Sequence, residues 1–144
     1  MSEFYVSVGD SASFTKTVGE SDVYLFAGIT GDFSPNHVNK AYMERSSYGR
    51  LMVHGALLVG FMSTTSTMVV AHCRDNADET PVSLGYDRVR FLAPAYFGDT
   101  LTVDYTISAV DLEARRSTGD VSIKNQDGIL VAVGTHILKW VPNE

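Results

Sequence analysis

The sequence is poor in cysteine, in clustered metal ligands and in long apolar runs. Its single cysteine, Cys73, excludes an internal disulfide and suits a reducing compartment. The four histidines and this cysteine have no metal-ligand spacing, so we expect no metal. The beginning of the chain lacks the basic start and apolar core of a signal peptide. The most apolar run, residues 57–71, is short and interrupted by hydroxyl residues. We therefore expect a soluble cytoplasmic protein without a membrane segment.

An excess of positive charge is also missing. The net charge is -6, and nucleic-acid binding needs a basic face to contact phosphates, so a nucleic-acid partner is not expected. What is present is ordinary globular composition, with 44% hydrophobic and 19% charged residues. The 144 residues are enough for one domain with a proper core and too few for two. We expect a single domain over residues 1–144.

The first third of the chain predicts short helices separated by a loop. Helical spacing of apolar residues predicts a helix over residues 22–29, which Gly31 ends. Residues 32–36 should form a loop, because Pro35 cannot continue that helix. A second short helix should follow over residues 40–46.

The rest of the chain predicts one long helix followed by strands. Residues 55–70 are apolar around nearly the whole helix, which is typical of a buried helix. The predicted strands cover residues 13–18, 82–91, 101–109, 115–124 and 129–140. A change in the phase of alternation near residues 87–88 predicts a bulge in the second of these. An antiparallel sheet must cover the long helix, so the fold class is α+β. The open sheet edge favours pairing with a second copy.

The loop after the first helix carries the strongest candidates for catalysis. Asp32 and His37 lie five residues apart across a turn that contains Pro35. A carboxylate and an imidazole are suited to proton transfer, and functional groups concentrate on loops. Phe33 and Pro35 would partly exclude water and strengthen the electrostatics of the site. The plainer interpretation is a helix-ending loop with a surface aspartate and histidine.

Gly55 is the candidate for stabilising a negatively charged oxygen. Its N–H lies in the first turn of the long helix, where no intrahelical acceptor exists and the helix dipole favours negative charge. Alternatively, Gly55 only permits tight entry into the helix. We expect His54 to cap the helix or pack at its start. Ser63 is either a hydroxyl near the acid–base pair or a serine bonded to its own helix.

Three segments of the sequence resemble one known family. They are residues 31–37 (GDFSPNH), residues 48–55 (YGRLMVHG) and residues 91–101 (FLAPAYFGDTL). Together they are similar to the MaoC-like dehydratases, and most of all to the R-specific enoyl-CoA hydratases. The resemblance implies a hot-dog fold, in which a curved antiparallel sheet wraps one long helix. It also implies a short helical overhang, here over residues 21–50.

The resemblance further implies a reaction and the residues that perform it. Asp32 and His37 match the catalytic pair, Gly55 the oxyanion donor and Ser63 a serine near the site. The reaction would be reversible hydration of a trans-2-enoyl-CoA to an R-3-hydroxyacyl-CoA, with coenzyme A as part of the substrate and no separate cofactor. The acyl-CoA would lie in a tunnel near the interface of a homodimer, or of a higher assembly of dimers.

The acyl pocket would be lined by overhang and helix residues such as Phe33 and Leu57. The sequence departs from the usual motif at three places, Ser34, Asn36 and Asn39, of which Asn36 places a polar group beside His37. Acyl chain length and the choice between CoA and a carrier-protein thioester stay open. So does the pathway, since fatty-acid degradation and supply of polyester precursors both use this reaction.

Two other functions remain as alternatives. A thioesterase of the same fold often has a carboxylate on the central helix, but residues 55–70 contain no Asp or Glu. A non-catalytic acyl-CoA-binding subunit would not need an acid, an imidazole and a glycine at the matching positions. Asp32, His37 and Gly55 are all present, which favours the hydratase.

Overall fold

The computed structural model describes residues 4–144 and contains one five-stranded antiparallel sheet. The order of the strands across the sheet is β1-β3-β4-β5-β2. Strand β1 pairs with β3, and the three pairs β3–β4, β4–β5 and β5–β2 complete the sheet. The strands are β1 (Ser11–Thr17), β2 (Glu79–Phe91), β3 (Thr100–Asp111), β4 (Arg116–Lys124) and β5 (Leu130–Pro142). The two edge strands do not pair with each other, so the sheet is open.

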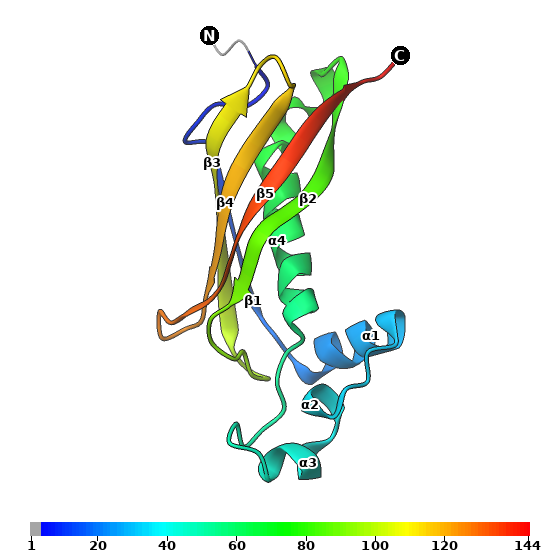
Figure 1. The fold of residues 1–144 in the computed structure, drawn as a ribbon, viewed down its shortest axis with the longest axis vertical. Coiled ribbons are helices and arrows are strands. Elements are labelled where there is room, and N and C mark those ends of the chain that lie inside the picture. Colours follow the sequence, from blue (N-terminus) through cyan, green and yellow to red (C-terminus); the bar gives the residue numbers. More distant parts are fainter. Residues whose placement is uncertain (1–3) are drawn as a thin grey trace.

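The long helix α4 (Gly55–Val69) lies along one face of this sheet (Figure 1). Its buried residues include Leu58, Phe61 and Met62. Strand β3 alternates through Ile107, and Leu101, Val103, Tyr105 and Ile107 are all nearly inaccessible. Burial of these apolar side chains is the main force that holds the helix against the sheet. The predicted arrangement of a sheet around one buried helix is confirmed.

Strand β2 is irregular, as the phase slip in the sequence predicts. Its register against β5 shifts between Ser83 and Gly85 and again between Asp87 and Arg90. Arg88 lies in the second irregularity with a φ of 54°, a left-handed conformation that is uncommon for a side-chain-bearing residue. Such bulges bend a strand and increase its twist, which lets this edge curve around α4.

The overhang consists of three helices near the N-terminal end of α4 (Figure 1). They are α1 (Glu20–Thr30), α2 (Pro35–Val38) and α3 (Lys40–Glu44). The predicted loop over residues 32–36 is shorter in the structure, because α2 already begins at Pro35. Proline suits the first position of a helix, where an N–H has no intrahelical acceptor. After α4 the chain continues as a 3-10 helix, η1 (Ala71–Asn76).

The described helices include none that could cross a membrane. Across residues 4–144, each falls short of the length and apolar character that a span requires.

A buried polar chain crosses the sheet beneath α4. The His136 ring is inaccessible, with Nδ1 at 2.9 Å from the Tyr105 hydroxyl and Nε2 at 2.8 Å from the Ser83 hydroxyl. Gly119 lies opposite His136, and a side chain there would collide with the Tyr105 ring. Burial lowers the pKa of His136 to about 4, because the charged form loses its hydration.

This burial predicts a loss of stability in mild acid. In the unfolded chain, His136 has an ordinary pKa near 6.5. Between about pH 6.5 and 4, the His136 ring is therefore protonated in the unfolded state but not in the folded state. The free energy of unfolding should therefore fall by up to about 3 kcal/mol as the pH drops from 7 to 4. Urea unfolding at several pH values between about 7 and 4 measures this fall in the free energy of unfolding. A His136→Gln variant should lack this part of the slope, and an unchanged slope would contradict the assignment.

Candidate active site

The end of helix α1 presents Asp32 at the surface. Gly31 adopts a left-handed φ of 82°, and its N–H donates to the Ala27 carbonyl at 2.8 Å, which ends the helix and turns the chain. Asp32 follows with an exposed side chain, and its Oδ1 accepts from the Ser34 N–H at 3.2 Å. The loop thus holds one carboxylate outward at the entrance to α2.

His37 is held in one tautomer by the main chain. Its Nδ1 lies 2.8 Å from the carbonyl oxygen of Met52. A carbonyl only accepts, so in the neutral ring Nδ1 carries the proton and Nε2 has a free lone pair. The Met52 N–H in turn donates to the Asn36 carbonyl at 2.9 Å. These two bonds tie α2 to the segment before α4 and leave His37 with a bare nitrogen that can accept a proton.

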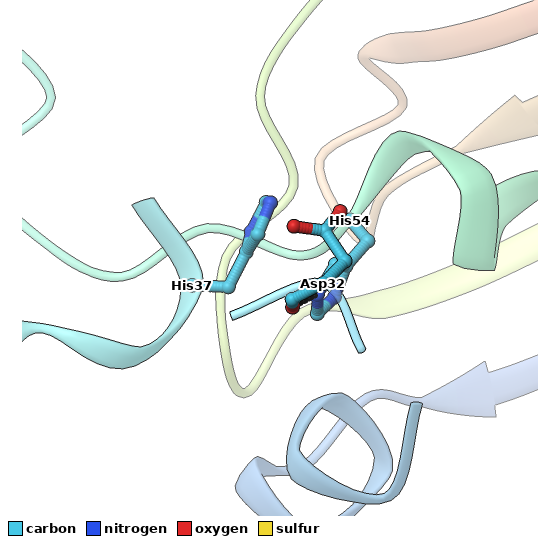
Figure 2. A group of neighbouring side chains, drawn as sticks. All are labelled: Asp32, His37 and His54. Atoms are coloured by element: carbon cyan, nitrogen blue, oxygen red, sulfur yellow. Dashed lines mark hydrogen bonds between the residues drawn. The ribbon is translucent and has the colours of Figure 1, made fainter. Parts of the chain in front are cut away.

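His54 lies between these two residues and the core. The ring is buried, with 1% of its surface exposed, and its Nε2 lies 3.0 Å from the main-chain carbonyl of Asp32. Its ring stacks on that of His37, with centroids 3.7 Å apart and planes 24° from parallel. Figure 2 shows Asp32, His37 and His54 gathered at one point, although they come from three separate parts of the backbone.

The sequence predicts only part of this role for His54. The ring does pack at the start of α4, but it makes no capping hydrogen bond to that helix. Its bond to Asp32 spans 22 residues. No local pattern signals such a contact, because it depends on how the overhang folds back onto the end of α4.

Among residues 4–144, these same three side chains lie close enough together to be considered as metal ligands. One ligand atom from each lies within 4.8 Å of the others. However, the nitrogen lone pairs of two stacked imidazoles lie in nearly parallel planes, so both cannot point directly at one ion unless a ring rotates. One nitrogen of each ring is also occupied by a carbonyl. The arrangement is better suited to holding a water and moving a proton than to binding an ion.

Gly55 follows His54 directly and is the first residue of α4. Its N–H makes no hydrogen bond within the described part of the chain. A Cβ at this position would lie 2.6 Å from the Phe91 ring, so a side chain here would require that ring to move. The site therefore combines a carboxylate, a bare imidazole nitrogen and a main-chain donor at a helix N-terminus.

The remaining predicted residues lie around this centre rather than in it. Phe33 is 59% exposed beside Asp32, and Leu57 packs against the core. Ser63 is exposed further along α4, and it has no hydrogen bond to Asp32 or His37 among residues 4–144. A surface pocket of about 270 Å³ lies nearby, lined by Tyr48, Met52, Phe91, Leu92, Ala93 and Pro94.

Comparison with known proteins agrees with this architecture. An (R)-specific enoyl-CoA hydratase from Rhodospirillum rubrum is 33% identical over 106 residues, covering 73% of this chain and 68% of the relative. Another from Aeromonas caviae is 27% identical over 139 residues, covering 96% of this chain and 98% of the relative. The solved structure of the A. caviae (R)-hydratase superimposes with a TM-score of 0.80 at 26% identity, covering 93% of this chain and 96% of that one.

A further solved structure, an R-hydratase from Pseudomonas aeruginosa, gives a TM-score of 0.81 at 27% identity, covering 96% of this chain and 84% of the other. These neighbours share the open sheet around one helix, and the fold is a hot-dog fold. The MaoC like domain matches residues 6–127, most of the chain. The chain therefore belongs to the MaoC-like domain family.

Proposed function

We propose that this protein hydrates a trans-2-enoyl-CoA to the R-3-hydroxyacyl-CoA, and catalyses the reverse dehydration. The observation that carries the proposal is that Asp32 and His37 each bring a polar side-chain atom within 4.8 Å of the other, while the Met52 carbonyl occupies Nδ1 of His37. The N–H of Gly55, which follows His54 directly, makes no hydrogen bond within the described chain. Named relatives with hydratase activity support the same reaction class. Coenzyme A enters as part of the substrate, and no separate cofactor takes part.

Asp32 and His37 transfer the proton, and Gly55 stabilises the negative charge that develops on the substrate. Asp32 and His37 hold one water, and as its oxygen bonds to C3 the pair takes up a proton. The electrons of the C2–C3 double bond move toward the thioester, whose oxygen gains negative charge. The Gly55 N–H stabilises that oxygen, an effect typically of about 3–4 kcal/mol in the barrier. The pair then returns the proton to C2 on the same face, so one water is added in total.

The exposed parts of the site are suited to an apolar acyl chain. Phe33 and Phe91 are both more than half exposed, and Leu57 lies in the first turn of α4. We propose Phe33, Leu57 and Ser63 as substrate-binding residues. The open edge at β2, with Leu84 half exposed, supports a homodimer whose interface adjoins the substrate.

A thioesterase is the second candidate from the sequence. Helix α4 contains no carboxylate, so no acid projects from the centre of the helix to activate water. The acid and the base instead meet at its N-terminal end. This placement favours addition of water to a double bond beside the thioester.

The test is incubation of the purified protein with crotonyl-CoA. Loss of the enoyl-thioester absorbance and formation of R-3-hydroxybutyryl-CoA are the expected results, without release of free CoA. A series of longer enoyl-CoAs follows if crotonyl-CoA is not turned over. Release of free CoA would indicate a thioesterase, and binding without turnover of any member of the series would indicate a non-catalytic subunit.

Replacing Asp32 by asparagine should abolish most turnover without unfolding the protein. The Asp32→Asn side chain keeps an oxygen for the Ser34 N–H but cannot take up a proton, so kcat should fall by about 10²–10⁴-fold. Steady-state kinetics measure this, and the thermal midpoint should stay near that of the wild type because Asp32 is exposed. Asp104→Asn, another exposed aspartate, is the matched control. Near-normal turnover in Asp32→Asn would contradict the assignment.

Adding a methyl group at Gly55 should destabilise the protein through Phe91. A Cβ would overlap the Phe91 ring, which is more than half exposed and can turn aside, so Gly55→Ala should lower the free energy of unfolding by about 0.5–1.5 kcal/mol, the cost of an unfavourable ring rotamer. In a Phe91→Ala background the same change should cost almost nothing. A double-mutant cycle by denaturant unfolding measures this coupling. Equal costs in the two backgrounds would show that the ring is not the obstacle.

A further inference from the structure

We propose that His54 is a positioning residue for the acid–base pair, acting through both of its members at once. Its Nε2–H fixes the main chain of Asp32, and its ring face fixes the ring plane of His37. The inference rests on the proposed function, since it assigns His54 a part in setting up that chemistry. His54 itself need not touch the substrate.

The bond to Asp32 anchors an otherwise weakly held loop. The other hydrogen bonds of this loop are local: Asp32 N–H donates to the Thr30 hydroxyl, Phe33 N–H to the Gly31 carbonyl and Ser34 N–H to the Asp32 carboxylate. Each spans two residues, and all of these groups lie near the surface. The bond from His54 is thus the link between Asp32 and the buried body of the protein within the described chain.

The stacking contact sets the second member of the pair. The His37 ring is held at Nδ1 by the Met52 carbonyl, and His54 lies two residues after Met52. The intervening Val53 is buried and its N–H donates to the Ala95 carbonyl at 2.8 Å. One short, firmly bonded segment therefore supplies both the acceptor and the stacking surface that orient the bare Nε2 of His37.

Packing alone does not account for an imidazole at position 54. Its Nδ1 is buried without a hydrogen-bond partner in the described chain, and leaving such an atom unpaired disfavours the folded state. A phenylalanine would fill a similar volume beside Phe26, whose ring centroid lies 4.7 Å away, without this defect. What the imidazole adds over such a ring is the Nε2–H that reaches Asp32.

Two substitutions separate the ring from the donor. His54→Phe keeps an aromatic face against His37 but removes the donor to Asp32. His54→Gln removes the ring but places an amide N–H near the position of Nε2. We expect His54→Phe to fold with a thermal midpoint close to the wild type, because removal of the unpaired nitrogen offsets loss of the bond to Asp32. Its kcat should nevertheless fall by about 10- to 100-fold with little change in KM, and His54→Gln should recover part of the loss.

A second readout does not depend on turnover. Amide hydrogen exchange in residues 30–38 should be faster in His54→Phe than in the wild type, while α4 keeps its protection. His72→Phe is the matched control, because His72 also bonds a main-chain carbonyl through Nε2, that of Tyr5, but beyond the far end of α4. Both kcat and the exchange of residues 30–38 should be unchanged in this control.

The outcomes separate the two proposals. A stable His54→Phe with wild-type kcat and wild-type exchange would overturn the positioning role. A wild-type protein that hydrates no enoyl-CoA would overturn the proposed function, and the exchange measurement would still decide whether His54 anchors the Asp32 loop. If His54→Phe lost α4 protection as well, the residue would be a general packing element and the inference would be wrong.

Discussion

The site depends on two hydrogen bonds from histidine rings to main-chain carbonyls. Nδ1 of His37 donates to Met52 and Nε2 of His54 donates to Asp32, so the two stacked rings are held in opposite tautomers. Because a carbonyl cannot donate, the main chain rather than a charged partner decides which nitrogen of each ring is bare. An imidazole whose tautomer is fixed in advance needs no rearrangement before it accepts a proton.

The fold supplies the rigid part of this arrangement. Burial of α4 against the sheet fixes the position of its first turn, and the segment before it is held to the loop after β2 by the Val53–Ala95 bond. The overhang then needs only a few contacts to bring Asp32 and His37 to that turn. The proposed catalytic groups thus lie on short helices and loops of the overhang, while the atoms that orient them belong to the segment that leads into α4.

Much of this architecture could be predicted from the sequence. Alternation through Ile107 in β3 and the apolar helix over residues 55–70 are strong local signals, and the motifs at Asp32, His37 and Gly55 indicated where to look for the site. The start of α2 at Pro35 was missed, because proline ends one helix and begins another equally well.

The contacts of His54 could not be predicted for a different reason. Its partners are the carbonyl of Asp32 and the ring of His37, and both contacts arise from how two segments meet in space. Neither hydropathy nor residue spacing carries that information. For the same reason, the sequence could not show that Ser63 makes no hydrogen bond to Asp32 or His37 within residues 4–144.

The most direct test of this account is the tautomeric state of the two histidines. Long-range proton–nitrogen correlation spectra of the ¹⁵N-labelled protein at pH 8 distinguish protonated from bare ring nitrogens. We predict that His37 carries its proton on Nδ1 and His54 on Nε2. A His37 ring protonated on Nε2 would have no bare nitrogen at the site, and this result would contradict the central claim.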